Sequence, residues 1–288
     1  MMGDSLTYYG PVIMGTSETT SATLNVVYDT GSDWLVVEGR ECAERSICKG
    51  NVYDPRANGA KRGERREIVQ RTYGSVKFKG TTWKDKVCVS DKWCRNDFEF
   101  FVAQTQEGLN GSPGLGEKID GIMGMARPIV PAGFRYELGP SFVQSMSNPK
   151  FNFHLAEKSK KEGGTSFVDF GPPVADKMKG DMDSALFVDL KQDFYWSSMI
   201  KAVGFGTAVV DGKNPNFAFT ADPVTKFSGR KTPYKQIYSI FDTGTSFTLI
   251  PANFWKPYTE YIVHHFKIEQ HIIKDGAFAF FCNERSKF

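Results

Sequence analysis

The stretch VVYDTGSDWLVV, residues 26 to 37, places Asp29, Thr30, Gly31 and Ser32 between two apolar runs rich in valine. Runs of this kind are typical of buried strands. Burying a carboxylate at the end of such a strand costs free energy unless its surroundings stabilise the charged form. A single Asp-X-Gly is most often only a turn, because aspartate hydrogen-bonds its own backbone and glycine accepts positive φ. One copy of the pattern therefore does not indicate chemistry by itself.

The chain contains a second copy in YSIFDTGTSFTLIP, residues 238 to 251, where Asp242 is followed by Thr243, Gly244 and Thr245. A repeat with the same apolar flanks and the same hydroxyl position indicates a duplicated lobe. Two carboxylates at matching places in two lobes can meet, and at close range they share one proton. One then serves as general base on a water molecule while the other donates a proton to a carbonyl oxygen.

The residues that follow the two aspartates suit this chemistry in three pairs: Gly31 and Gly244, Ser32 and Thr245, Thr30 and Thr243. The glycines let backbone N–H groups approach the carboxylates. The hydroxyl groups of the second pair can donate hydrogen bonds to them. The threonines can tie each loop to the backbone of the other loop. The sequence therefore predicts Asp29 and Asp242 as a catalytic dyad with these six residues in support.

Six further elements, in the same order along the chain, resemble those of the pepsin-like aspartic peptidases, family A1. They are LTYYGPVIMGT (6–16), YDPRANG (53–59), RTYGSVKFKG (71–80), DGIMGMA (120–126), GTSFVDFG (164–171) and Tyr195-Trp196. The resemblance covers nearly the whole chain. It implies an all-β, bilobal fold with a central cleft between two related β-rich lobes, the first over 1–174 with the first loop and the flap, the second over 175–288 with the second loop.

Composition agrees with a strand-rich and turn-rich chain, because 40% of the residues are hydrophobic and 28 Gly and 14 Pro punctuate the short apolar runs. The best candidates for helices are 140–148 and 251–266, each opened near a proline. The resemblance also assigns residues 71–80 to a flap hairpin, in which Tyr73, Gly74 and Ser75 would contact substrate. In pepsins a tryptophan seven residues after the first aspartate bonds the flap tyrosine, but here Val36 occupies that position, and the nearby Trp34 reads as a core residue.

Five cysteines are present. Cys42 and Cys48 enclose a short loop that matches a small disulfide loop of the family, and Cys88 and Cys94 have the same spacing, so two disulfides are expected if the protein follows an oxidising route. Free thiols in a cytosolic protein are the alternative. Cys282 is left without a partner.

The second lobe looks incomplete in sequence. The element Asp120 to Gly124 follows the first loop and would brace it, but no comparable Ile-Leu-Gly element follows Asp242. KDGAFAFF (274–281) comes too early and lacks the second glycine. We therefore expect a chain truncated in its C-terminal lobe. The first residues, MMGDSLTYYG, show neither a signal peptide nor a basic prosegment.

Several classes of function are disfavoured. The net charge is only +3, and the densest basic run, 61–71, contains two glutamates, so nucleic acid is not an expected partner. No apolar run approaches the roughly 20 residues of a membrane span. The four histidines are scattered, and neither cysteine spacing is that of a zinc site, so no metal or other cofactor is expected.

The resemblance implies an aspartic endopeptidase that acts on peptide or protein substrates at acid pH as a monomer in a secreted or lysosomal/vacuolar setting. Two alternatives stay open. One is a protein-binding or inhibitor module on the same fold, although such proteins usually carry substituted aspartates. The other is a catalytically inactive fragment whose second lobe does not fold.

Overall fold

The structure is a computed structural model of the whole chain. It describes residues 2–3, 7–17, 19–45, 47–64, 69–74, 76–109, 114–116, 118–127, 139–147, 149–156, 165–173, 187–200, 202–204, 217–220, 226–227, 230–231, 237–265, 267–269, 271–274 and 277–280. The chain divides into two compact units. Unit 1 holds Met1–Trp196 and Ile240–Ser246, and unit 2 holds Ser197–Ser239 and Phe247–Phe288. The lobe boundary at 174 remains a prediction, since 174–186 lie outside the described residues.

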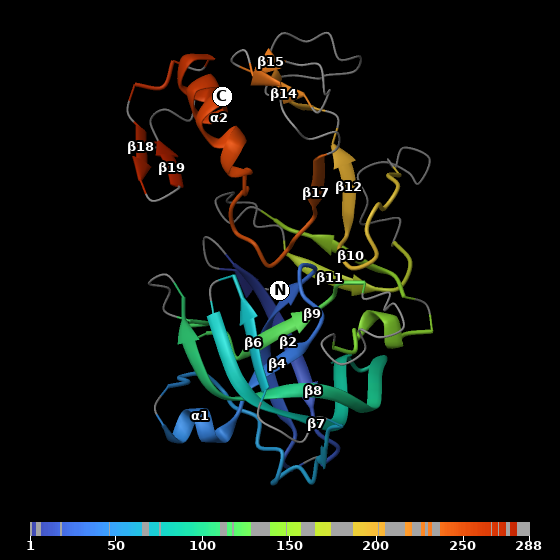
Figure 1. Cartoon of the computed structure of the whole chain (residues 1–288). Helices are drawn as coiled ribbons and strands as arrows, with labels where there is room; N and C mark the ends of the chain where they lie inside the picture. Colours follow the sequence, from blue (N-terminus) through green and yellow to red (C-terminus); the bar gives the residue numbers. More distant parts are fainter. Residues whose placement is uncertain are drawn as a thin grey trace. The chain divides into compact units, whose positions relative to one another are not determined.

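Unit 1 is built on a closed six-stranded barrel (Figure 1). In spatial order its strands are β2 (Tyr8–Met14), β3 (Ala22–Asp29), β9 (Gly121–Gly124), β4 (Leu35–Glu38), β8 (Trp93–Gly108) and β7 (Val76–Ser90). Pairs between Ile13 and Cys88 and between Met14 and Val87 close the ring from β2 to β7. The fold of this unit is therefore mostly β, as the sequence predicts.

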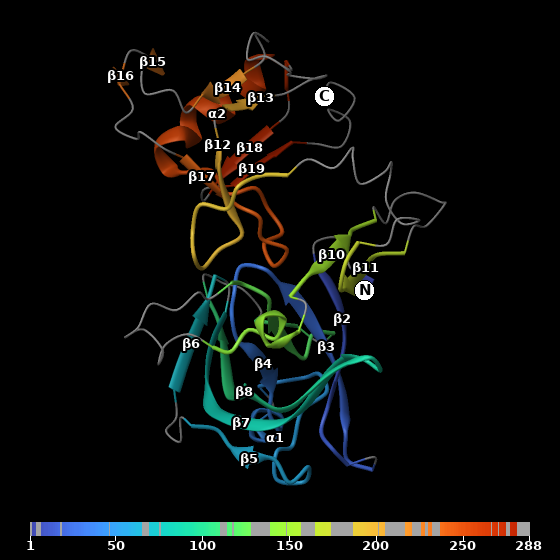
Figure 2. The ribbon, with the colours of Figure 1, turned by 90° about the vertical axis from the view of Figure 1, so that its right-hand side faces the viewer.

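Three shorter strands extend the same sheet. They are β1 (Met2–Gly3) on β2, β5 (Lys61–Arg62) on β7 and β6 (Val69–Tyr73), which also pairs with β7 (Figure 2). The last pair of the hairpin of β6 and β7 is that of Tyr73 with Val76, so the tip of the hairpin lies at this pair. This hairpin is the segment that the sequence assigns to the flap.

The valine-rich flanks of the first Asp-Thr-Gly loop form the centre of the barrel. β9 pairs in parallel with β3, so that Val26 faces Gly121 and Asp29 faces Gly124. It pairs antiparallel with β4 on its other side, where Leu35 faces Met123. Most of the apolar side chains from these strands are almost completely buried, in the large core of the barrel or in two smaller clusters. Each fully buried side chain of this size contributes about 1.5–3 kcal/mol, so the loop between β3 and β4 is fixed at both ends.

The remaining elements of unit 1 lie around the barrel. They are the helix α1 (Arg40–Glu44), the 3-10 turn η1 (Val143–Ser145) and the hairpin of β10 (Phe151–His154) and β11 (Phe167–Phe170). Two disulfides, Cys42–Cys48 and Cys88–Cys94, join the cysteine pairs that the sequence suggests. Each closes a short loop and contributes roughly 2 kcal/mol by chain entropy. Cys282 lies outside the described residues.

The helix predicted over 140–148 is wrong in extent. Only Val143–Ser145 forms a 3-10 turn. The hydroxyl of Ser145 donates to the carbonyl of Phe142 at 2.6 Å, and such local bonds compete with the helical pattern. The short helix α1 has no counterpart in the sequence prediction.

Unit 2 contains the second predicted helix and several two-stranded sheets. α2 spans Ala252–His265 and confirms the helix expected over 251–266. The strands are β12 (Ser197–Ile200), β13 (Ala202–Gly204), β14 (Phe217–Thr220), β15 (Lys226–Phe227), β16 (Arg230–Lys231), β17 (Ile237–Ile240), β18 (His271–Lys274) and β19 (Ala277–Phe280). They pair as β12 with β17, β13 with β14, β15 with β16, and β18 with β19. No helix in the described part of the chain is long and apolar enough to cross a membrane.

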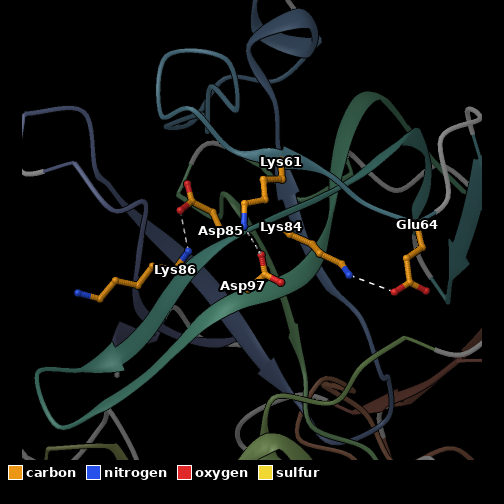
Figure 3. A network of polar contacts seen from close by, with 6 residues as sticks. All are labelled: Lys61, Glu64, Lys84, Asp85, Lys86 and Asp97. Carbon is orange, nitrogen blue, oxygen red and sulfur yellow. Dashed lines mark hydrogen bonds and ion pairs between the residues drawn. The ribbon is translucent and has the colours of Figure 1, made fainter.

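The outer face of the barrel carries ion pairs between β5, β7 and their neighbours (Figure 3). Lys61 pairs with Asp97 at 3.3 Å, and Lys84 pairs with Glu64 at 3.1 Å. Three of these four side chains are well exposed, so each pair is worth no more than about 1 kcal/mol. The surface charges therefore contribute little to the stability of the barrel.

A different carboxylate, Glu38 at the end of β4, is completely buried. Gln106 donates a hydrogen bond to Glu38 Oε1 at 2.9 Å, while Oε2 has no partner among the described residues. Burial raises the pKa of Glu38 to about 7, and the nearby negative charge of Asp120 acts in the same direction. The folded protein therefore favours the protonated form of Glu38 well above its ordinary pKa of 4.5.

This burial predicts a pH dependence of stability. A carboxyl group whose pKa is raised in the folded state stabilises the fold below its unfolded pKa of 4.5, and this contribution is lost as the pH rises to about 7. The loss amounts to at most about 3 kcal/mol. Glu38→Gln removes the titrating group and keeps a side-chain oxygen that can accept the hydrogen bond from Gln106. We expect Glu38→Gln to raise the free energy of unfolding relative to the parent at pH 7 far more than at pH 4, as measured by urea denaturation.

The matched control for this measurement is Glu44→Gln, which changes an exposed glutamate of α1. Its stability should follow that of the parent at both pH values. Parallel stability curves for Glu38→Gln and the parent between pH 4 and pH 7 would contradict the prediction.

Candidate active site

The two Asp-Thr-Gly loops lie together in unit 1, because the segment Ile240–Ser246 belongs to that unit. The backbone N–H of Thr30 donates to Thr243 Oγ1 at 3.1 Å, and the N–H of Thr243 donates to Thr30 Oγ1 at 3.0 Å. The hydroxyl of Thr30 donates to the carbonyl of Phe241 at 2.7 Å, and that of Thr243 donates to the carbonyl of Tyr28 at 2.6 Å. Each contact of one loop thus has a counterpart in the other, and in each contact a threonine side chain of one loop bonds the backbone of the other.

Each carboxylate is held by its own loop in the same way. The N–H of Gly31 donates to Asp29 Oδ1 at 2.9 Å, and Ser32 donates to Asp29 Oδ2. The N–H of Gly244 donates to Asp242 Oδ1 at 2.8 Å, and Thr245 donates to Asp242 Oδ2 at 2.5 Å. Hydrogen bonds from N–H and O–H groups fix the orientation of both carboxylates.

The glycines of the two loops are required by the closeness of the opposite aspartates. A Cβ atom on Gly31 would overlap the carboxylate of Asp242, and a Cβ atom on Gly244 would overlap the carboxylate of Asp29. Only a residue without a side chain fits at either position. The two carboxylates therefore approach across the paired loops.

The two aspartates differ in their surroundings. Asp29 is buried, whereas Asp242 is only half-buried. Burial raises the pKa of Asp29 to about 7, and the hydrogen bond and negative charge of Asp242 act in the same direction, while the bonds from Ser32 and Gly31 lower it. Two neighbouring carboxyl groups that share one proton can serve as a general acid and a general base.

The first loop is braced by the segment that follows β9. The N–H of Met125 donates to the carbonyl of Asp29 at 2.8 Å, and the N–H of Ala126 donates to the carbonyl of Ser32 at 2.8 Å. At the start of β9, the buried carboxylate of Asp120 accepts hydrogen bonds from the N–H groups of Asn25 and Asn51, each at 2.7 Å. Asp120 thereby anchors β9 to the strand that carries Asp29.

The second loop is tied to the same bracing segment through Trp196. The N–H of Phe241 donates to the carbonyl of Trp196 at 2.9 Å. The indole N–H of Trp196 donates to the carbonyl of Met125 at 2.8 Å. Met125 therefore connects both loops, through its N–H to the first and through its carbonyl to the second.

The apolar flanks of the two loops differ sharply in exposure. Tyr28 is 2% exposed, whereas its counterpart Phe241 is 56% exposed. Trp34 is 2% exposed and its counterpart Phe247 is 68% exposed. Val36 is completely buried, whereas its counterpart Leu249 is 77% exposed. In the first copy these side chains pack in the cores of the barrel. In the second copy the described residues leave them uncovered, although the sequence pattern is the same.

Of the three predicted flap residues, the structure describes Tyr73 and Gly74. Tyr73 packs edge-on against Phe78, with ring centroids 5.7 Å apart, and its hydroxyl oxygen is buried. Gly74 is exposed at the tip of the hairpin, and Ser75 lies outside the described residues. Burial raises the pKa of Tyr73 well above 10, and the negative charges of Asp33 and Asp29 add to this, so the hydroxyl lies in the field of the dyad.

Sequence reasoning missed two charged residues beside the dyad, Asp33 and Arg71. Asp33 accepts a hydrogen bond from the N–H of Gly139, and the positive charge of Arg71 acts on it. The missed signal was the unusual pair of a carboxylate directly after Asp-Thr-Gly-Ser and an arginine two residues before the flap tyrosine. In the described part of the chain, no group of three or more His, Cys, Asp or Glu side chains is placed to hold a metal ion.

Comparison with known proteins agrees with this site. A family model described as "Eukaryotic aspartyl protease" matches residues 7–287. Similar proteins include a "Probable vacuolar protease A" of Trichophyton verrucosum, 27% identical over 252 residues, which are 85% of this chain and 53% of that protein, and "Pepsin-2B" of Gadus morhua, 30% identical over 248 residues, 85% of this chain and 65% of that protein. "Vacuolar protease A" of Arthroderma otae is 27% identical over 237 residues, 80% of this chain and 55% of that protein.

The chain spans about half the length of the vacuolar relatives that it matches. The family match nevertheless covers nearly all of its residues, including both Asp-Thr-Gly loops. The chain belongs to the pepsin-like family A1 of eukaryotic aspartyl proteases.

Proposed function

We propose that this protein is an aspartic endopeptidase that hydrolyses peptide bonds with the dyad of Asp29 and Asp242. The observation that carries the proposal is the reciprocal arrangement of the two loops, in which each carboxylate is oriented by its own glycine and hydroxyl residue. A site made of two oriented carboxyl groups needs only water and an amide to catalyse hydrolysis. No cofactor enters the reaction.

The different burial of the two aspartates suggests their roles. The pair shares one proton, and the greater burial of Asp29 favours that proton on its carboxyl group. The carboxylate of Asp242 then takes a proton from a water molecule as the oxygen attacks the amide carbon, and Asp29 donates its proton to the carbonyl oxygen. When the tetrahedral intermediate collapses, the C–N bond breaks and the proton held by Asp242 passes to the leaving nitrogen. One hydroxyl of the intermediate returns its proton to Asp29 as its oxygen becomes the carbonyl of the new acid, which restores the starting dyad.

The hairpin of β6 and β7 has the form of a flap that could hold a substrate. Tyr73 and Gly74 lie at or next to its tip, and a hairpin of this kind excludes water from the reacting groups when it closes on a peptide. We propose that Ser75, which lies outside the described residues, also contacts substrate. We propose a peptide or protein substrate on this basis, with the protein acting as a monomer. The names of the relatives support a vacuolar setting, and a secreted or lysosomal one is also consistent with the two disulfides.

The exposed flanks of the second loop favour a second candidate. Phe241, Phe247 and Leu249 lack the cover that their counterparts have around the first loop. Among the described residues, the apolar flanks of Asp242 are therefore less well packed than those of Asp29. The corresponding alternative function is a catalytically inactive pepsin-fold protein, whether a fragment or a module that binds other proteins.

Removal of one dyad carboxylate tests the primary proposal. Asp29→Asn keeps the size of the side chain and an oxygen that can accept from the N–H of Gly31, and its NH2 can donate to Ser32, but it abolishes the shared titratable pair. We expect peptidase activity on an acid-denatured protein substrate to fall by at least about 100-fold, the usual contribution of a general acid or base. Circular dichroism should show the parent fold. Asp97→Asn, which alters an exposed carboxylate on the barrel surface, should retain parent activity. Full activity of Asp29→Asn would exclude the dyad mechanism, and an inactive parent would favour the second candidate.

The pKa of Asp29 predicts the pH profile. The reaction needs one protonated and one ionised carboxyl group, and the protonated form is lost as the pH rises through about 7. We therefore expect kcat/KM to be greatest on the acid side of neutrality and to decline above pH 7. Initial rates between pH 2 and pH 9 on one peptide substrate measure this. A maximum above pH 8 would show that another group is catalytic.

The uncovered flanks of the second loop predict an exposed apolar surface in solution. An apolar patch of this kind binds the dye ANS and promotes association. We expect Phe247→Ser combined with Leu249→Ser to lower ANS emission relative to the parent, because both side chains are more than half exposed. Thr248→Ala, which lies between them, serves as the control and should leave emission unchanged. Equal emission from the parent and the double variant would show that these side chains are covered.

A further inference from the structure

A group of charged and aromatic side chains lies beside the first loop, on the side of the flap. Arg71 lies on β6, two residues before Tyr73, and its guanidinium carbon lies 5.0 Å from the centroid of the Trp34 ring. The same carbon lies 6.0 Å from the centroid of Phe101. A guanidinium within about 6 Å of an indole face is attracted by the ring, and its planar shape allows it to stack.

Asp33 completes the group from the opposite segment. It follows the first loop directly, and its Oδ2 accepts a hydrogen bond from the N–H of Gly139. Burial raises the pKa of Asp33, whereas the bond from Gly139 and the positive charge of Arg71 lower it. Asp33 and Arg71 therefore attract each other, one from the segment after the catalytic loop and the other from the flap strand.

Tyr73 depends on its strand for its position. Its hydroxyl is buried, and no residue in the described part of the chain accepts its hydrogen bond. Among the described strands, β6 pairs with β7 alone, so its other edge makes no ladder. The ladder to β7 and the packing of the Tyr73 ring on Phe78 fix β6 on one side only. The contacts of Arg71 with Trp34 join β6 to the segment that follows the first loop.

We propose that Arg71 is a positioning residue that, together with Trp34 and Asp33, forms a latch between the flap strand β6 and the first catalytic loop. The latch holds Tyr73 near the dyad in place of a hydrogen bond to its hydroxyl. It acts in the resting protein, so it can be tested without turnover. Its effect on catalysis rests on the proposed peptidase function.

The deciding experiment is amide hydrogen exchange over residues 69–73. Arg71→Met keeps the apolar stem of the side chain and removes the charge and the planar group. We expect these amides to exchange roughly 10-fold faster than in the parent, because local opening of an edge strand becomes easier. Arg71→Lys retains the attraction to Asp33 but loses the stacking, so it should give an intermediate rate. It also provides a second test if Arg71→Met does not fold.

The barrel offers a matched control. The guanidinium carbon of Arg62 on β5 lies 4.2 Å from the centroid of Trp83, the same kind of contact on a different strand. Arg62→Met should leave exchange over 69–73 unchanged. Asp33→Asn should resemble Arg71→Met, and the double variant should exchange no faster than either single variant. Unchanged exchange in Arg71→Met, or equal acceleration by Arg62→Met, would overturn the latch.

Kinetic measurements add a second test, because a residue with a purely structural role would not change kcat selectively. We expect kcat/KM of Arg71→Met to fall roughly 10-fold, mainly through kcat, since small misplacements of groups beside the reacting atoms are costly. The midpoint of global unfolding should stay that of the parent, and Arg71→Lys should restore part of kcat. Parent kinetics in Arg71→Met would overturn the proposal. If the parent itself shows no turnover, the proposed function fails, and hydrogen exchange alone decides the latch.

Discussion

The reciprocal hydrogen bonds between Thr30 and Thr243 are the constraint on which the site depends. They join two loops that are far apart in sequence, and they use the backbone of each loop as well as its side chain. Because each threonine hydroxyl also donates to a carbonyl of the opposite strand, neither loop can shift without breaking bonds in both directions. The closeness of the two carboxylates, and the need for glycine at Gly31 and Gly244, follow from this junction.

The barrel supplies the rigidity that this junction requires. β9 lies between β3 and β4, so the first loop is anchored by ladders on both of its strands. Met125 extends this support to the second loop through Trp196. A buried carboxylate such as Asp29 is tolerated only where such surroundings are fixed, because desolvation costs free energy that a mobile loop would avoid by exposing the group. The site thus places a buried carboxyl group, which is costly to desolvate, in one of the best-packed parts of the chain.

Much of this arrangement could be predicted from the sequence. The repeat of Asp-Thr-Gly with a hydroxyl residue indicated the paired loops, because four adjacent residues provide both the carboxylate and the groups that bond it. The element at 120–126 indicated the brace, and α2 followed from its apolar spacing. The shortening of the helix over 140–148 could not be predicted, because it depends on a single serine hydroxyl. The attraction between Asp33 and Arg71 was missed for a different reason. It joins the segment after the first loop to β6, and these two parts of the chain are far apart in sequence. The unequal cover of the two loops does not follow from the local pattern, since Trp34 and Phe247 occupy equivalent positions in nearly identical patterns. The sequence signal for a less well braced second loop was the lack of an Ile-Leu-Gly element after Asp242.

The buried Glu38 has a consequence for the lifetime of the molecule. It and Asp29 favour their protonated forms up to about the same pH, although one lies in the wall of the barrel and the other in the dyad. Transfer from an acidic to a neutral environment therefore charges both groups within one interval of pH. A peptidase built in this way would become less active and less durable at the same moment, so that its working range and its persistence would be set together by the acidity of its surroundings.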